Sequence, residues 1–193
     1  MLLDAVRKKD KEAIVKTFDL YAKPLYNYAL RLCGDPLLAD NIVGDVFVRL
    51  LEQLAAGKGP TSNLRSYLYE TAYHRIVDEA RFSRHRAPLD AVTSLRTDAR
   101  PGLQGSEDQI MFEKVVDAIQ HDLTDDQRHV LVLRFLEEFS LRETASILGK
   151  DINHVKVLQT RALAKLRKVF ANKEIRTAMA LPKVEELSKA LGV

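Results

Sequence analysis

The sequence predicts an all-α protein of two small helical domains joined by a flexible linker, with a helix-turn-helix in the second domain. Apolar residues recur at three- and four-residue steps through most of the chain, for example at Ile14, Phe18, Tyr21 and Leu25, and this is the helical period. Strand signals are almost absent. Between residues 87 and 106 the period is lost, while Pro, Gly, Ser and Thr accumulate as they do in linkers.

The first domain, residues 1–86, is predicted to hold three long helices, at about 11–33, 36–54 and 64–86. Pro24 lies inside the first of these helices, where a proline can kink the chain. The Gly-Asp-Pro break at residues 34–36 separates the first helix from the second. Ser62 or Asn63 is the candidate N-cap of the third helix.

The second domain, residues 107–170, is predicted to begin with helices at about 107–121 and 125–138, followed by the helix-turn-helix. Thr124 and Gln127 have the spacing of a capping box at the start of the middle helix. Residues 171–193 form a C-terminal extension whose apolar residues predict a short amphipathic helix. Packing on the second domain, a partner surface and a frayed end remain alternatives for it.

Residues 140–168 carry the clearest functional signal, a short helix, a tight turn and a longer basic helix. Ser140 and Glu143 form a second capping box, and Gly149 stands where a left-handed residue ends a helix. No acidic residue occurs between Ile152 and Asn172, although five cations lie there. This pattern is typical of a helix-turn-helix that enters a DNA major groove. The alternative is a helical hairpin with a solvated basic face.

The composition fits a mildly basic protein, with a formal net charge of +3. Acidic residues gather around 35–52 and basic residues around 81–86, as expected of a nucleic-acid binder that also docks on a protein. The single cysteine, Cys33, excludes an internal disulfide and is expected to be a buried small residue. Neither a membrane-spanning run nor a secretory signal is found, so a cytoplasmic protein without membrane insertion is expected.

An enzymatic function is not indicated by any motif. His74 and Asp78 are four residues apart on one predicted helix and His85 is nearby, but no fourth ligand has suitable spacing for a metal. Nucleotide-binding loops, nucleophile elbows and Cys–His pairs are also missing. We therefore expect neither catalytic residues nor a bound metal or cofactor.

These parts, in this order, resemble a bacterial RNA polymerase sigma factor of the extracytoplasmic-function (ECF) group. Residues 11–54 resemble the core-polymerase-binding region, residues 63–86 the region that recognises and opens the −10 element, and residues 123–168 the region that reads the −35 element. Members usually carry an acidic pair and a glutamine where this chain has Asp40, Asn41 and Gly44. The resemblance implies a two-domain helical fold and promoter-specific transcription initiation.

The helix at 36–54 is expected to face its own core with one side and a partner with the other. Val48 and Leu51 are apolar but fall on the arc opposite the predicted core, which suggests a protein-binding patch. The resemblance makes core polymerase that partner. The alternative is a helix buried on both sides. The predicted docking residues are Asp40, Asn41, Gly44, Asp45, Val48 and Leu51.

The third helix carries aromatic and basic residues on one face, a combination that suits unpaired DNA because rings stack on bases and cations follow phosphates. The loop before it resembles the place where the family captures a flipped base, although an ordinary solvated loop is the alternative. The predicted −10 contacts are Lys58, Asn63, Tyr67, His74, Arg81 and Arg84.

The last helix is expected to present its N-terminal outer residues to base edges, because that end of a recognition helix enters the groove most deeply. Val157 suits a thymine methyl group and Lys156 suits guanine acceptors. The cations farther along are expected mainly to neutralise phosphates. The predicted −35 contacts are Asn153, His154, Lys156, Val157, Thr160, Arg161 and Lys165.

The expected partners are core RNA polymerase and promoter DNA, and the resemblance also implies an anti-sigma factor. Two other hypotheses remain open on the sequence. One is a stand-alone helix-turn-helix regulator that never contacts polymerase, and the other is a protein–protein adaptor. The discriminating features are the outward apolar patch and the aromatic-basic face of the first domain, because a simple regulator needs neither.

Overall fold

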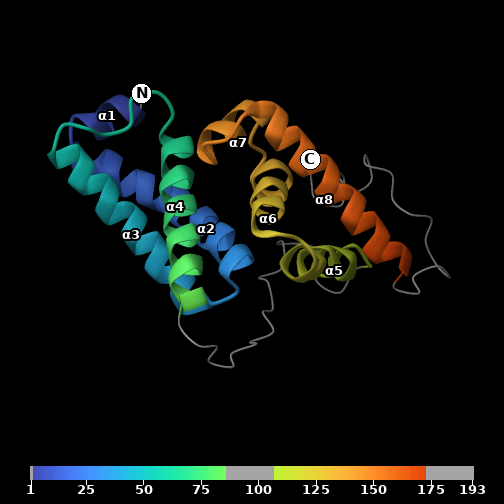
Figure 1. The fold of residues 1–193 in the computed structure, drawn as a ribbon. Coiled ribbons are helices and arrows are strands. Elements are labelled where there is room, and N and C mark those ends of the chain that lie inside the picture. The colour runs from blue at the N-terminus through green and yellow to red at the C-terminus, as the bar shows by residue number, and fades with distance from the viewer. Residues whose placement is uncertain (1, 86–106, 173–193) are drawn as a thin grey trace. The chain divides into compact units, whose positions relative to one another are not determined.

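The computed structural model describes residues 2–85 and 107–172, and every regular element in these two ranges is a helix (Figure 1). The chain divides into two compact units, the first holding α1 to α4 and the second holding α5, α6, η1 and α8 with most of α7. The predicted all-α fold class is therefore confirmed. The predicted linker at 87–106 and most of the C-terminal extension lie outside the described residues.

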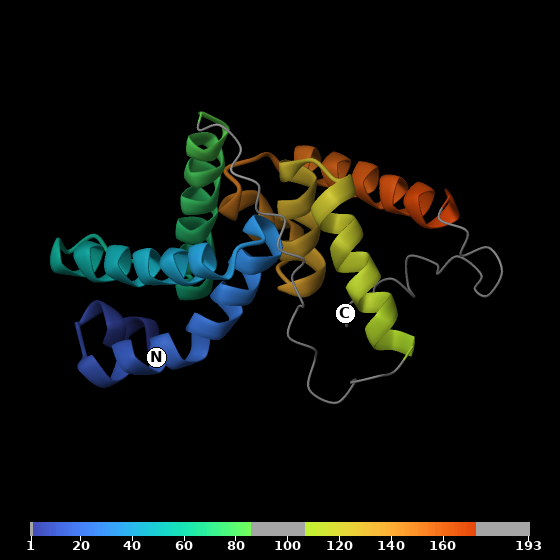
Figure 2. The same ribbon diagram turned by 90° about the horizontal axis from the view of Figure 1, so that it is seen from below.

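The first unit consists of α1 (Leu2–Arg7), α2 (Lys11–Cys33), α3 (Pro36–Ala55) and α4 (Leu64–His85). Helices α2, α3 and α4 pack against one another, and α1 packs on α2 (Figures 1 and 2). Their shared core contains fully buried side chains from each long helix, including Leu25, Ile42 and Leu68. The rings of Tyr28 and Tyr69 lie 5.1 Å apart within it. Three helices are thus held with one face each toward the core and the other outward.

The breaks between these helices follow from local sequence. Gly34 ends α2 in the left-handed region with a φ of 75°, a conformation that costs glycine little. Asp35 then caps α3, since its carboxylate accepts hydrogen bonds from the N–H groups of Leu37 and Leu38. Asn63, one of the two candidate caps of α4, accepts from the N–H of Ser66 at 3.1 Å. The short helix α1 was not predicted from the sequence.

The second unit consists of α5 (Glu107–Asp122), α6 (Asp125–Leu131), the π-helix η1 (Val132–Leu136), α7 (Leu141–Ile147) and α8 (Ile152–Asn172). The prediction of one helix over 125–138 is wrong at its C-terminal end, because the chain widens into η1 at Val132 and leaves helix after Leu136. The N–H of Glu137 bonds to the carbonyl of Val132, five residues back. An almost continuous apolar run at 130–136 concealed this change of period.

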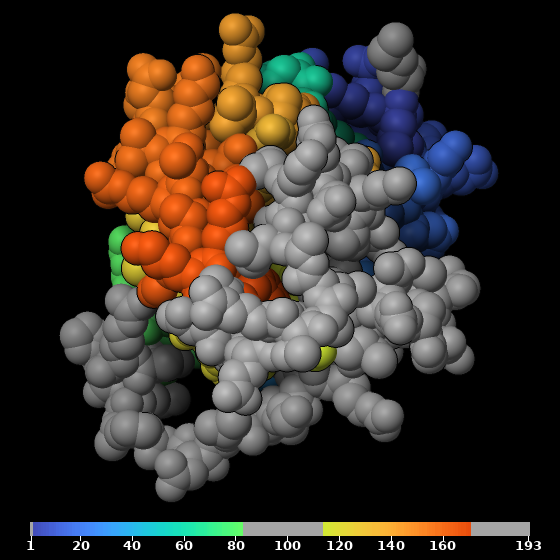
Figure 3. Space-filling model, turned by 90° about the vertical axis from the view of Figure 1, so that its right-hand side faces the viewer, coloured from blue at the N-terminus to red at the C-terminus, as the bar shows by residue number. Residues whose placement is uncertain are grey.

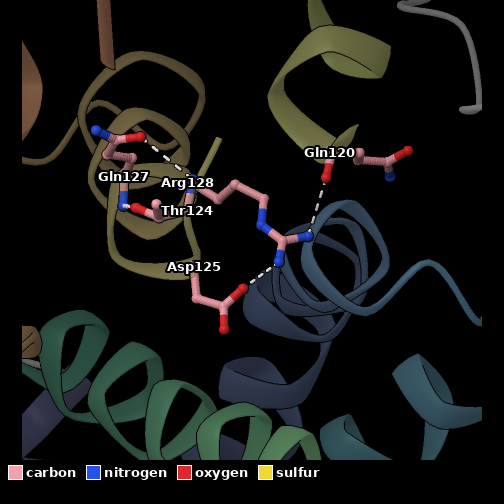
Figure 4. A network of polar contacts seen from close by, with 5 residues as sticks. All are labelled: Gln120, Thr124, Asp125, Gln127 and Arg128. Carbon is pink, nitrogen blue, oxygen red and sulfur yellow. Dashed lines mark hydrogen bonds and ion pairs between the residues drawn. The ribbon is translucent and has the colours of Figure 1, made fainter. Parts of the chain in front are cut away.

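The junction of α5 and α6 is a polar network around Arg128 (Figure 4). Its guanidinium donates to the carbonyl of Gln120 at 3.1 Å and pairs with Asp125. Thr124 and Gln127 form the predicted capping box, which is confirmed. The two acidic residues at the start of α6 each pair with a cation, Asp125 with Arg128 and Asp126 with Lys150.

Cys33, which was expected to be buried, is only half-buried at the end of α2. Its thiol lies 3.6 Å from the carbonyl oxygen of Asp35. Burial is the main cause of a raised thiol pKa. This shift favours the protonated form of the thiol.

Candidate DNA-binding and partner-binding surfaces

The outer face of α3 is uncovered. All six predicted docking residues are exposed, and the apolar side chains of Val48 and Leu51 are 55% and 46% exposed. The alternative of a helix buried on both sides is therefore wrong. A Cβ atom added at Gly44 would meet nothing within 4 Å, so the middle of this face is open.

An ion pair joins this face to α4. Arg75 Nε donates to Asp45 Oδ2 at 2.6 Å, and Arg75 Nη1 donates to Glu79 at 3.3 Å. The hydrogen bond to Asp45 is the main cause of the raised pKa of Arg75. The carboxylate of Asp45 thus belongs to the predicted docking face and also binds α4. Arg75 was not predicted as a functional residue from the sequence.

A hollow with mostly polar walls lies along α3, the following loop and α4, and it is lined by six of the −10 and docking candidates together with other residues. Lys58 and Asn63 are exposed in the loop, and the amide oxygen of Asn63 is engaged in capping α4. Tyr67 is half-buried, and this burial raises the pKa of its hydroxyl, opposed by a hydrogen bond with Thr71 and by the charge of Arg49.

Arg49 and Gln53 of α3 also line the hollow. The sequence analysis did not predict a role for either residue, because it considered α3 only for polymerase docking and α4 only for DNA binding. The one signal in the sequence was that both residues lie on the same helix as the docking residues and close to them. The structure shows that one edge of α3 contributes to the same hollow as α4.

Farther along α4, the predicted −10 residues continue on the exposed side. His74 is exposed, and its ring lies 5.3 Å from that of Tyr73. Arg81 is exposed and lies 3.8 Å from Asp78. Arg84 is placed in α4, but its side chain lies outside the described part. Tyr67, His74 and Arg81 are spaced by seven residues, which keeps them close to one line along a helix.

Metal binding finds no support among residues 2–85 and 107–172. Within these ranges no group of three or more His, Cys, Asp or Glu side chains is placed to hold an ion. Of the three residues considered for a site, His74 and Asp78 are both exposed, while the side chain of His85 lies outside the described part. The exposed side of α4 offers rings and cations instead.

The predicted helix-turn-helix is confirmed in its geometry. The Ser140 N–H donates to Glu143 at 2.9 Å, and the Glu143 N–H donates back to the Ser140 hydroxyl at 3.2 Å. Gly149 ends the first helix in the left-handed region with a φ of 59°. Asp151 then begins α8, accepting from the N–H of Asn153 at 2.7 Å.

Helix α8 divides into an inner apolar side and an outer polar side. Val155, Leu158, Ala162 and Leu166 are buried, as predicted. Part of the α8 surface is seen in orange to red in Figure 3. All seven predicted −35 residues are exposed, and Val157 is 44% exposed. No acidic residue lies between 152 and 172. This side therefore offers cations and polar groups, with no carboxylate that would repel DNA phosphates.

The turn of the helix-turn-helix is tied to α6 by a link that the sequence did not reveal. Lys150 Nζ lies 3.0 Å from Asp126 Oδ2, and the Lys150 side chain is only 19% exposed. The N-terminal end of α8 is therefore held against α6 by an ion pair in which Lys150 is largely covered and Asp126 is 44% exposed.

Residues 17–86 match the Sigma-70 region 2 family, and residues 121–168 match the Sigma-70, region 4 family. Together these matches span more than half of the chain. The chain belongs to the ECF sigma factors. Relatives of the chain in Streptomyces coelicolor and Bacillus subtilis carry that same description, and the predicted family is confirmed.

The similar proteins include ECF RNA polymerase sigma factor BldN of Streptomyces coelicolor, 25% identical over 88% of this chain. This sigma factor spans 64% of the length of BldN. ECF RNA polymerase sigma factor SigX of Bacillus subtilis is 28% identical, with 82% of this chain and 84% of SigX covered.

Solved structures show the same fold. The sigma factor RpoE of Bartonella quintana, in complex with the anti-sigma factor NepR, has a TM-score of 0.64 at 21% identity, covering 82% of this chain and 96% of that one. CnrH in complex with the cytosolic domain of CnrY has a TM-score of 0.65 at 19% identity, covering 89% and 96%. Among the described helices of this sigma factor, none is long and apolar enough to cross a membrane.

Proposed function

We propose that this sigma factor binds core RNA polymerase and directs promoter-specific initiation by recognising −10 and −35 elements. It acts in the cytoplasm and directs an enzyme without being one. The observation that carries the proposal is the presence of three separate exposed surfaces, on α3, α4 and α8, in a chain that matches Sigma-70 regions 2 and 4. A stand-alone regulator needs only the last of these surfaces.

The outer face of α3 docks on core polymerase. Val48 and Leu51 supply apolar area at its centre, and Gly44 leaves the helix backbone open between them and the polar residues Asp40 and Asn41. An exposed apolar patch rimmed by polar groups is typical of a protein–protein contact. This division of labour assigns polymerase binding to residues 1–86.

The same domain engages the −10 element through α4 and the preceding loop. The half-buried ring of Tyr67 and the exposed ring of His74 are available to stack on unpaired bases, each stack being worth about 1–3 kcal/mol. Lys58 and Arg81 are exposed cations beside them and follow the phosphates. Polar side chains lining the hollow are suited to reading the edge of a flipped base.

The second domain, residues 107–170, reads the −35 element through the outer side of α8, and the linker at 87–106 sets the spacing of the two elements. The residues that reach base edges are Asn153, Lys156, Val157 and Thr160, whereas Arg161 and Lys165 neutralise phosphates. Their exposure on the side opposite the buried face supports these roles.

An anti-sigma factor is the proposed regulator. The similar RpoE structure was solved with the anti-sigma factor NepR bound. For this chain, such a partner covers the α3 and α8 surfaces and so prevents polymerase and DNA binding. Purification from the host without an inhibitory partner under any condition would contradict this part of the proposal.

Reconstitution tests the function directly. The purified protein is added to sigma-free bacterial core polymerase, and transcripts from fragmented host DNA are mapped. Defined new start sites that depend on the protein are expected, with shared sequence elements upstream. Binding to duplex DNA without association with core, and without transcripts, would instead support the stand-alone regulator.

A further inference from the structure

Arg134 lies at the centre of η1, directly before the helix-turn-helix, and is hydrogen-bonded in two directions. Its Nη1 donates to the carbonyl oxygen of Phe139, and its Nε donates to Gln159 Oε1 at 3.3 Å. Residues 134 and 159 are 25 positions apart in the sequence. One guanidinium therefore connects the π-helix, the segment leading into α7 and the recognition helix α8.

The π-helix brings these groups together. Glu137 and Phe139 donate their N–H groups to the carbonyls of Val132 and Leu133, and Glu138 then turns the chain with a φ of 55°. The carbonyl of Phe139 is thereby returned toward Arg134. Single π-turns within helices frequently occur at functional sites, and here the π-turn lies beside the first residues of the helix-turn-helix.

Gln159 occupies a boundary position on α8. It is half-buried between the buried Leu158 and the exposed Thr160. The apolar contacts of the inner side of α8 are non-directional and so constrain rotation of the helix less than a hydrogen bond does. The Lys150–Asp126 pair fixes the start of the helix, and the Arg134–Gln159 bond adds a second fixed point two turns later.

We propose that Arg134 is a positioning residue for promoter reading, fixing the rotation of α8 through Gln159 so that Lys156, Val157 and Thr160 face base edges together. The inference rests on the proposed reading of the −35 element by α8. It assigns to Arg134 no contact with DNA. Its half-buried guanidinium, already bonded to Phe139 and Gln159, is the feature that separates it from the exposed Arg161.

The test uses the full chain and a duplex library randomised at its centre, from which the wild-type protein first selects its preferred site. The affinities for that site and for a scrambled duplex of equal length are then measured over a range of salt concentrations. The variants are Arg134→Ala, Arg134→Lys, Gln159→Ala and the double variant Arg134→Ala/Gln159→Ala. Arg161→Ala serves as the reference for a phosphate contact.

We expect each single alanine variant to lose about tenfold in preference for the selected site, similar to one mismatched base pair. Affinity for the scrambled duplex and the salt slope stay at wild-type values, and the double variant is no worse than either single one because both break the same link. Arg134→Lys does not restore the preference, since an ammonium lacks the planar fork that bridges two acceptors.

Three results would overturn the inference. A salt slope reduced by about one in Arg134→Ala would show a direct phosphate contact. Additive losses in the double variant would separate Arg134 from Gln159, and an unchanged preference would leave Arg134 as a purely structural residue. If Arg134→Ala does not fold at the assay temperature, Gln159→Ala decides alone. Failure of the wild-type protein to select any site would refute the proposed −35 reading itself.

Discussion

Arg75 and Asp45 form an ion pair of 2.6 Å between α4 and α3, and this pair connects the helix proposed to open DNA with the helix proposed to dock on polymerase. Their side chains are 38% and 51% exposed, so solvent screens the pair strongly. Its importance is therefore expected to lie in binding more than in stability.

Replacement of Arg75 by alanine is expected to lower the free energy of unfolding by no more than about 1 kcal/mol, as is usual for exposed pairs. It releases the Asp45 carboxylate for a partner, so affinity for core polymerase is retained or increased. Asp45→Ala removes that carboxylate and weakens core binding without changing affinity for −35 duplex DNA. Core binding is measured by fluorescence anisotropy, and equal losses in both variants would contradict the assignment.

Replacement of Leu51 by serine is expected to weaken core binding about tenfold, corresponding to about 1.4 kcal/mol, because an apolar contact at the centre of the docking face is lost. Stability should be almost unchanged, since Leu51 is already 46% exposed. Val157→Ser is the matched control, because Val157 is 44% exposed but lies on α8, outside residues 11–54 that resemble the core-binding region. A similar loss of binding in both variants would indicate a general surface effect.

Arg161→Ala is expected to weaken binding to all duplexes and to lower the salt slope by about one, because one phosphate contact is lost. Val157→Ala should leave the slope unchanged but reduce preference at a single base pair, as expected for loss of contact with a thymine methyl group. Titrations of both variants against selected and scrambled duplexes separate these effects. An unchanged slope in Arg161→Ala would remove that residue from the phosphate contacts.

His129 is expected to make the second unit sensitive to acid. Its burial, with the nearby charge of Arg128, lowers its pKa from 6.5 to about 4. Between pH 6.5 and about 4, His129 therefore binds a proton in the unfolded chain but stays neutral in the folded chain. The contribution of His129 to stability is complete above pH 6.5 and falls as the pH approaches 4. The slope is about 1.4 kcal/mol per pH unit and the total loss roughly 3 kcal/mol.

Urea unfolding of the full chain, followed by NMR signals of α6 at several pH values, measures this effect. Carboxylates also titrate below pH 5, so the comparison is with His129→Leu, in which the contribution of the histidine is missing. Identical pH dependence of the two proteins would show that His129 is accessible to protons in the folded state.

Features that depend on neighbouring residues were predictable from the sequence. The caps at Ser140 and Thr124, the left-handed Gly149 and the two sides of α8 each follow from a few adjacent positions, and each is confirmed. The outward position of Val48 and Leu51 followed from the helical period of α3. Candidate surfaces that lie on a single helix could therefore be predicted from the sequence.

Features that join distant segments were not predictable. Asp45 and Arg75 are 30 residues apart, and Arg134 and Gln159 are 25 apart. Their pairing depends on how helices cross, which a single sequence does not encode locally. The π-helix was hidden because the apolar run at 130–136 fits several helical periods equally well. Helix α1 is too short to stand out by periodicity, and tertiary packing of Val6 supports it.

The uncovered Val48 and Leu51 also have a consequence for the lifetime of the protein. An apolar patch that is exposed in the free chain favours self-association and recognition by chaperones and proteases. Molecules without a partner are then expected to be removed faster than molecules with the patch covered. The cellular amount of this chain would follow the supply of its binding partners, and its rate of synthesis would set only an upper limit.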